Sequence, residues 1–306
     1  MQREILKYAR NTLQPMFETF SRSWEITKQT FRVINADREI LLYPVVSSII
    51  SIIFFVVMVF PFIATGLVSE ILSRDAGAFL FWVTLFGFYL GVSFVATFFN
   101  VATVYCANKR FHKGNPTFTE GLKEAFKRIH LIFLWSLVSA TVGILINSLE
   151  NSAKKSKGIS RVIISAVASL VGMAWSIVTL FVIPAIVIEN VGPVDAIKRS
   201  AQTLKKTWGE SLIRHFGLGA AQGMFSFAGF FFLLAPAIVS LVFFQSILMF
   251  AVLMALFIIY IVIVSLVFST ANTVFNTALF VYAKTGKIPG FYSKDTMKHA
   301  FKAEKK

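Results

Sequence analysis

The feature of this sequence that most limits its fold is a set of long stretches without Asp, Glu, Lys or Arg. They occupy residues 40–69, 76–108, 131–149, 162–188 and 216–283. A helix of about 20 apolar residues crosses a hydrocarbon layer of about 30 Å, so each stretch is long enough for one membrane span and the last for two. The chain is therefore predicted to be an all-α polytopic membrane protein.

The composition excludes other classes of protein. Hydrophobic residues make up 56% of the chain and charged residues only 15%, whereas a soluble domain contains about 25% charged residues. This leaves too little polar surface to cover a water-soluble globule, and it also rules out a disordered or collagenous chain. The single cysteine, Cys106, excludes an intramolecular disulfide and a cysteine-based metal cluster.

Six transmembrane helices are expected. Their predicted ranges are Ile40–Val68, Gly77–Ala107, Leu131–Leu149, Arg161–Ile188, Leu212–Phe243 and Ile247–Ala283. The last uncharged stretch should break near Pro236 or at Gln245-Ser246 to form a hairpin, and the sequence leaves open whether the segment near Pro236 re-enters the membrane. Several spans are longer than a bilayer requires, so we expect them to tilt or to project beyond the hydrocarbon.

The distribution of positive charge predicts the orientation. With six spans, 25 of the 30 Lys and Arg residues fall on the side that carries both termini. Positive charge accumulates on the cytoplasmic side, so the chain is expected in the cytoplasmic (inner) membrane with both termini in the cytoplasm. The first 39 residues are charged throughout and lack the apolar core of a cleavable signal peptide. Because the basic residues flank membrane spans, the net charge of +15 indicates anionic lipid and not nucleic acid.

A series of short sequence motifs recurs in the same order along the chain. Residues 99–102 (Phe-Asn-Val-Ala) precede a Gly-Pro turn and the segment 120–126 (Glu-Gly-Leu-Lys-Glu-Ala-Phe). Residues 275–278 (Phe-Asn-Thr-Ala) precede a similar turn and the segment 295–301 (Asp-Thr-Met-Lys-His-Ala-Phe), and a looser copy follows at 192–200. This order predicts three parallel helix-pair repeats related by an axis along the membrane normal. The repeat units are about 16–116, 117–192 and 193–289, around a transmembrane domain of residues 40–283.

Each copy has the pattern of a short amphipathic helix on the cytoplasmic interface. A Pro or Gly ends the preceding segment, an acid follows in the first turn near the positive end of the helix dipole, and Lys alternates with aliphatic residues. Residues 1–39 predict a longer helix of the same kind, and the tail 284–306 is also basic and amphipathic. The apolar face of the N-terminal helix is predicted from spacings of three and four at Phe17, Phe20, Trp24, Thr27, Phe31 and Ile34.

These basic helices predict contacts with lipid headgroups, because each juxtamembrane Lys or Arg gains about 1 kcal/mol near anionic lipid. The candidate interface residues are Trp24, Lys28, Lys123, Lys127, Lys198, Arg199, Lys205 and Lys298. We therefore expect a protein without enzymatic activity that binds or organises anionic lipid or assembles as a membrane scaffold. Membrane lipids are the expected partners, and assembly with copies of itself stays open.

The sequence contains no pattern that is typical of a catalytic or metal-binding site. The predicted spans hold no ionisable group at membrane depth, where enzymes and proton-coupled transporters usually keep one. Glu189 lies at the end of the fourth span, where we interpret it as a cap for the turn at Gly192-Pro193. The four histidines lie at span boundaries without metal-ligand spacing, and no phosphate-binding loop or nucleophile elbow occurs. No catalytic residue, cofactor or metal is predicted.

Amides within the spans leave a second function open. Asn100, Asn272 and Asn276 either form hydrogen bonds between helices or line a polar path through a channel or carrier. Asn272 and Asn276 are four residues apart and so share one helix face. Small residues at spacings of four, such as Gly87 and Gly91, predict close helix packing. A third alternative is an accessory subunit of a larger membrane complex.

Two segments carry a resemblance to known families. They are residues 20–24 (Phe-Ser-Arg-Ser-Trp) and residues 182–193 with the following Ala196-Ile197-Lys198-Arg199-Ser200 and Trp208. The chain resembles uncharacterised six-span membrane families of bacteria and archaea, which are similar to the membrane domain that precedes the catalytic part of some glycerophosphodiester phosphodiesterases. The resemblance covers most of the chain and implies a six-span fold. The sequence has no soluble catalytic domain, so phosphodiesterase activity is not expected.

Overall fold

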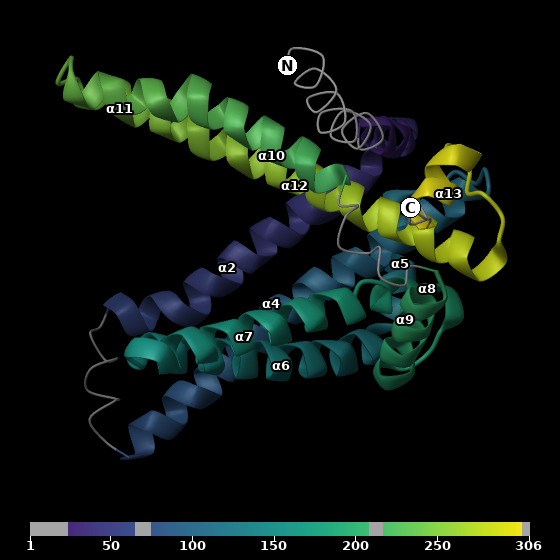
Figure 1. The fold of residues 1–306 in the computed structure, drawn as a ribbon, viewed down its shortest axis with the longest axis horizontal. Coiled ribbons are helices and arrows are strands. Elements are labelled where there is room, and N and C mark those ends of the chain that lie inside the picture. Colours follow the sequence, from purple (N-terminus) through teal and green to yellow (C-terminus); the bar gives the residue numbers. More distant parts are fainter. Residues whose placement is uncertain (1–23, 65–74, 208–216, 302–306) are drawn as a thin grey trace, which may run out of the picture. The chain divides into compact units, whose positions relative to one another are not determined.

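The computed structural model describes residues 24–64, 75–207 and 217–301, and every regular element in these ranges is a helix (Figure 1). Six helical segments are long and apolar enough to cross a membrane, which confirms the predicted number. Their ranges are Arg38–Phe60, Trp82–Phe111, Ile129–Lys155, Gly158–Glu189, Ala221–Val242 and Ile247–Thr285.

The chain forms two compact units. The central unit comprises residues 42–109 and 114–206, and the terminal unit comprises the described parts of 1–41, 110–113 and 207–306. The first four spans therefore belong to the central unit. The terminal unit combines the last two spans with residues from the N-terminal segment. From the sequence alone, residues 1–39 are expected to form a segment separate from the transmembrane domain.

The central unit contains seven helices among its described residues. They are α2 (Leu42–Ala64), α4 (Asp75–Phe111), α5 (Phe118–Lys127), α6 (Ile129–Lys155), α7 (Gly158–Val178), α8 (Val182–Glu189) and α9 (Pro193–Thr207). α6 and α7 pack along each other as an antiparallel hairpin (Figure 1). The predicted fourth span is divided between α7 and α8. Pro184 has no N–H to donate to Leu180, and the helix is interrupted at Thr179–Phe181, one turn before this proline.

The terminal unit begins with a helix over residues 24–36, which we call the N-terminal helix. The elements that follow are a 3₁₀ turn (η1, Arg38–Leu41), α10 (Gly217–Gly229), a π-helical turn (Phe230–Leu234), α11 (Ala235–Val242), α12 (Ile247–Thr285) and α13 (Lys294–Phe301). α10 and α11 run back along α12, and together they form a second hairpin (Figure 1).

The long uncharged stretch breaks at Gln245-Ser246, the second of the two predicted positions. Gln245 adopts a positive φ of 51°, and the Ser246 hydroxyl accepts the N–H of Met249 at 3.3 Å to cap α12. The chain remains helical through Pro236. This proline cannot donate to the carbonyl one turn earlier, and the π-helical turn that precedes it accommodates the missing hydrogen bond.

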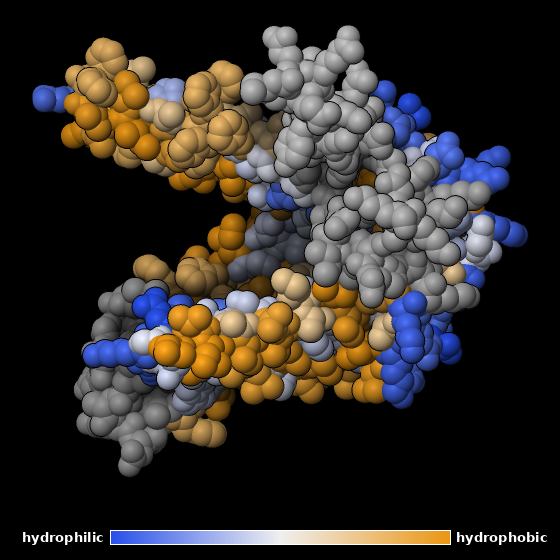
Figure 2. Space-filling view, in the orientation of Figure 1, coloured by the Kyte–Doolittle hydropathy of each residue, from blue (hydrophilic) through white to orange (hydrophobic). Residues whose placement is uncertain are grey.

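Buried residues concentrate toward one end of the long helices. In α4 they lie between Thr97 and Phe111, and in α12 between Val264 and Val281. The other halves of these helices expose many large apolar side chains, as does most of α7. Figure 2 shows these hydrophobic residues over the α10–α12 hairpin and along α6 and α7. Exposed apolar surface of this extent is typical of helices that contact lipid, so the chain is a multi-pass membrane protein.

Candidate functional site

The short helix α5 begins with a capping box. The Thr117 hydroxyl accepts the N–H of Glu120 at 3.3 Å, and the Glu120 carboxylate accepts the N–H of Thr117 at 3.3 Å. The same carboxylate accepts a hydrogen bond of 2.6 Å from Lys109 in the last turn of α4. This bond holds the pKa of Glu120 below its ordinary value. The acid in the first turn therefore also ties α5 to the end of α4.

Tyr43 and Gly121 fix the other side of α5. The fully buried Tyr43 donates to the carbonyl of Phe118 at 3.0 Å and stacks on its ring with centroids 4.8 Å apart. A Cβ at Gly121 would overlap the Tyr43 hydroxyl and lie 2.9 Å from the Cys106 sulfur. Glycine is required here because it lets α5 approach α2 and α4 closely. The side of α5 that carries Gly121 and Ala125 is thus packed against protein.

Helix α9 is attached to the interruption between α7 and α8. The buried hydroxyl of Ser200 accepts the N–H of Phe181 at 3.1 Å and so satisfies a backbone donor that the interruption frees. Arg199 pairs with Glu189 at 3.4 Å. Ala196 is buried on the same side of α9 as Ser200, whereas Lys198 is exposed. One face of α9 therefore packs inward and the basic residues face outward.

In the terminal unit, the N-terminal helix fixes the start of α13. Ser293 caps α13 by accepting the N–H of Thr296 at 3.1 Å. Gln29 accepts the N–H of Ser293 at 3.0 Å and donates to its hydroxyl at 3.3 Å. Thr30 and Tyr292 share a hydrogen bond of 3.0 Å, and burial raises the pKa of Tyr292. The N-terminal helix is therefore an integral part of this unit.

Only part of the predicted apolar face of the N-terminal helix is exposed, and the rest is buried within the protein. Thr27 and Ile34 are only 4% and 2% exposed, whereas Trp24 is 44% exposed and Phe31 is half-buried. Phe17 and Phe20 lie outside the described residues. A spacing of three and four residues identifies an apolar face, but it does not distinguish lipid from protein as the medium that covers it.

The predicted headgroup residues fall into two groups. Lys127, Lys198 and Arg199 pair with Glu124, Asp195 and Glu189. Lys28, Lys123 and Lys205 are exposed and form no ion pair with another described residue. Lys298 lies in α13, but its side chain is outside the described part of the structure. The charge of Lys123 contributes to the lowered pKa of nearby Glu120, whereas Lys28 and Lys205 have no acid partner in the described ranges.

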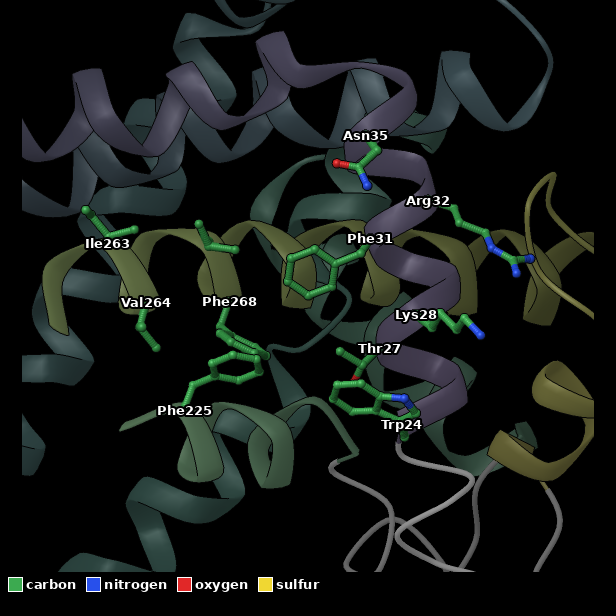
Figure 3. A pocket seen from close by; sticks show the side chains of 11 residues that line it. Trp24, Thr27, Lys28, Phe31, Arg32, Asn35, Phe225, Ile263, Val264 and Phe268 are labelled. Carbon is green, nitrogen blue, oxygen red and sulfur yellow. The ribbon is translucent and has the colours of Figure 1, made fainter. Parts of the chain in front are cut away.

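A pocket of about 550 Å³ lies within the terminal unit, between the N-terminal helix, α10 and α12. The rings of Phe31, Phe225 and Phe268 form part of its wall, and the Phe268 centroid is 5.7 Å from each of the other two (Figure 3). The lining residues are Trp24, Thr27, Lys28, Phe31, Arg32, Asn35, Phe225, Ile263, Val264, Val267 and Phe268. The charged ends of Lys28 and Arg32 turn away from the rings (Figure 3). Trp24, Thr27 and Phe31 belong to the apolar face that their spacing predicts, but no motif in the sequence connects them with the lining residues on α10 and α12.

The three candidate amides are half-buried. Asn272 and Asn276 lie on α12 in the terminal unit, and Asn100 lies on α4 in the central unit. A separate pocket of about 420 Å³ in the central unit lies between α4 and α6, and its wall includes Asn147 and Asn151, whose amides share a hydrogen bond of 2.7 Å.

A buried acid in the terminal unit was not among the predicted site residues. Asp37 is 8% exposed, and its Oδ2 has no hydrogen-bond partner among the described residues. Burial raises the pKa of Asp37, although the nearby Arg110 opposes this shift. Arg110 also donates to the carbonyl of Ala36. The only signal in the sequence is the position of an acid directly before the first span, which looks like a solvated boundary residue.

No group of three or more His, Cys, Asp or Glu residues within the described ranges could hold a metal ion. The model of the DUF6159 family, a family of unknown function, matches residues 78–291. This match does not connect the chain with the membrane domain of glycerophosphodiester phosphodiesterases, so that part of the resemblance has no support. No curated protein matches the chain. Because the family match spans most of the sequence, the chain belongs to the DUF6159 family of unknown function.

Proposed function

We propose that this protein is a non-enzymatic membrane protein that binds or organises anionic lipid at its basic side. In this proposal both termini lie on the cytoplasmic side of the inner membrane. The observation that carries the proposal is the way the short helices are held. α5 and α9 are attached by buried contacts on one face, at Gly121 and Ser200, while Lys123, Lys198 and Lys205 are exposed. Cations on such rigid helices are well placed to attract anionic headgroups.

The proposal includes three helix-pair repeats. Thr117 and Ser293 both cap a short helix through a side-chain hydroxyl. Thr117 lies 17 residues after Asn100, and Ser293 lies 17 residues after Asn276. The Asn of the Phe-Asn motif and the residue that caps the short helix therefore keep the same spacing in both units. This equal spacing supports duplication of the first and third units. α9 begins at Pro193, within the looser copy at residues 192–200 after the fourth span.

The position of the amides gives less support to a channel or carrier. α12 contains 39 residues and is about 58 Å long at about 1.5 Å per residue, roughly twice the thickness of the hydrocarbon layer. Counted from Ile247, Asn272 and Asn276 lie about 38 and 44 Å along the helix. A polar route across the bilayer needs such side chains near the middle of the hydrocarbon. Their place beyond about 30 Å favours a structural role at the basic end.

The proposed function predicts a lipid preference that depends on headgroup charge. The full-length chain is reconstituted in nanodiscs that contain anionic phosphatidylglycerol and zwitterionic phosphatidylcholine in equal amounts, and co-purifying lipid is counted by native mass spectrometry. The triple variant K123Q, K198Q and K205Q should lose most of the enrichment of phosphatidylglycerol. The matched variant K154Q, K155Q and K157Q, which removes three lysines from the opposite side, should keep it. Equal retention of both lipids by the unaltered protein would remove the proposal.

A further inference from the structure

We propose that the pocket beside the N-terminal helix holds one acyl chain of an anionic phospholipid, with the headgroup beside Lys28 and Arg32. This inference rests on the proposed function and adds to it a discrete site for a single lipid. The pocket lies entirely within the terminal unit. Its volume of about 550 Å³ is in the range of about 300 to 1,000 Å³ that ligand sites in proteins occupy.

The wall of the pocket suits a hydrocarbon chain. Phe31, Phe225 and Phe268 cover part of it with aromatic rings, and Ile263 and Val264 add aliphatic surface from α12 (Figure 3). An ordered water needs two to four polar partners. The side chains in the wall offer few polar atoms, because Phe, Val and Ile make up most of the set. An apolar ligand therefore fills this space more favourably than water does.

The depth of the pocket matches the boundary of the hydrocarbon layer. Ile263 and Phe268 lie 16 and 21 residues after Ile247, where α12 begins. These separations correspond to about 24 and 32 Å along the helix, and a hydrocarbon layer is about 30 Å thick. When the hairpin turn lies at the far edge of that layer, the pocket lies at the edge nearest the basic residues. An acyl chain then enters the pocket from the lipid, and its headgroup remains at the surface.

The cations beside the pocket fit a negatively charged headgroup. Lys28 and Arg32 are four residues apart and both exposed, and neither forms an ion pair with another described residue. Their aliphatic stems contribute to the lining while their charged ends turn away from the aromatic rings (Figure 3). By contrast, Lys127 and Lys198 are paired with acids on their own helices. Two unpaired cations next to an apolar pocket are complementary to an amphiphile with an anionic head.

Two variants test the site through its two halves. Val267 is a half-buried residue of the lining, so V267F should fill the pocket and reduce the retention of one phosphatidylglycerol molecule about tenfold or more in native mass spectra. V262F adds the same ring on the exposed face of α12 and should retain that lipid. The double variant K28Q and R32Q should abolish the preference of this molecule for phosphatidylglycerol over phosphatidylcholine. K154Q with R161Q, which removes one exposed lysine and one exposed arginine from the opposite side, is its matched control and should keep the preference.

The outcomes separate this site from the general function. Retention of the single lipid by V267F, together with an unchanged preference for phosphatidylglycerol in the double variant K28Q and R32Q, would overturn the pocket proposal. This holds even when the triple variant of the lysines on α5 and α9 loses its headgroup enrichment. A free fatty acid or a protein segment as the retained species would overturn it as well. If V267F does not fold, as judged by its thermal unfolding, K28Q and R32Q decide the test, because both side chains are exposed.

Discussion

The two helical hairpins, α6–α7 in the central unit and α10–α12 in the terminal unit, differ most at their turns. The turn of α6–α7 lies at Ser156-Lys157 and is flanked by Lys154, Lys155 and Arg161. The turn of α10–α12 exposes Phe243 and Phe244, at 77% and 71%, in a stretch without any charged residue. Charged residues avoid hydrocarbon, whereas exposed phenylalanines favour it. The comparison predicts that only the first of these two turns emerges fully into water.

The hairpins are also held together differently. In α6–α7, Trp135 and Trp175 stack with centroids 5.9 Å apart, and a Cβ at Gly172 would meet Ile146 at an ordinary distance of 3.8 Å. In α10–α12, a Cβ at Gly229 would overlap the ring of Tyr260. The hydroxyl of Tyr260 donates to the carbonyl of Phe225 at 2.8 Å. A stacked aromatic pair joins the helices of the first hairpin. The second hairpin adds close approach at one glycine and one hydrogen bond to the ring contact of Phe225 with Phe268.

The largest effect is expected from cysteine labelling of the two turns. K157C should react readily with a membrane-impermeant maleimide in vesicles opened to both sides, whereas F244C should react about tenfold more slowly or less. The reason is that an apolar environment limits access and disfavours the reactive thiolate. The single native cysteine, Cys106, is buried and gives a low background. Equal labelling rates would show that the turn of α10–α12 also reaches water.

A methyl group at one glycine should separate the two helix contacts. G229A should lower the free energy of unfolding by about 1 to 3 kcal/mol, because the added atom overlaps Tyr260 in a packed contact. G172A is the matched control, and it should be neutral or stabilise by up to about 1 kcal/mol through higher helix propensity. Thermal unfolding in detergent measures both. Equal effects of the two substitutions would remove the distinction between the hairpins.

The sequence predicted the six spans because charge and hydropathy report directly on exclusion from water, and it left two positions open for the second turn, of which Gln245-Ser246 is the one observed. It did not identify which glycines make close contacts. Gly91 is tightly packed against Phe54, but a Cβ at Gly87 would have open space within 4 Å. Gly229 was not part of any small-residue pattern. Spacing alone does not specify which helix lies opposite a residue, and that partner decides whether a glycine is required.

The candidate site was predictable only in its local parts. The exposure of Lys28 and Lys123 follows from helical periodicity, and the pair Lys198 and Asp195 follows from its spacing of three residues. The pocket joins the N-terminal helix to residues more than 190 positions later, such as Phe225 and Phe268. No local pattern encodes such an encounter, because it depends on how the whole unit packs.

A smaller effect is expected from the hydrogen bond across the second hairpin. Y260F should lower the free energy of unfolding by about 0.5 to 1.5 kcal/mol, because it removes the donor to the Phe225 carbonyl and leaves the ring in place. In the first hairpin, T141V removes a hydroxyl that bonds only to the Leu137 carbonyl within its own helix, so its effect should be smaller. Chemical denaturation in mixed micelles measures the difference. A larger loss for T141V would contradict this account of the second hairpin.

The smallest effects concern two acids, one in each unit, whose pKa values shift in opposite directions. Hydrogen bonds from Lys127 and Arg128 lower the pKa of Glu124, so its stabilising contribution is present above the ordinary value of 4.5 and is lost as the pH falls. Burial raises the pKa of Asp37, so its contribution is present below the ordinary value of 3.8 and is lost as the pH rises through the folded-state pKa.

At neutral pH, E124Q should therefore be less stable than the unaltered protein and D37N more stable, each by under about 1 kcal/mol. Both differences should shrink toward about pH 4, as followed by thermal unfolding. A stabilising E124Q at neutral pH would contradict the paired environment of that acid. A D37N variant whose effect does not change with pH would show that the pKa of Asp37 is the same in the folded and the unfolded protein.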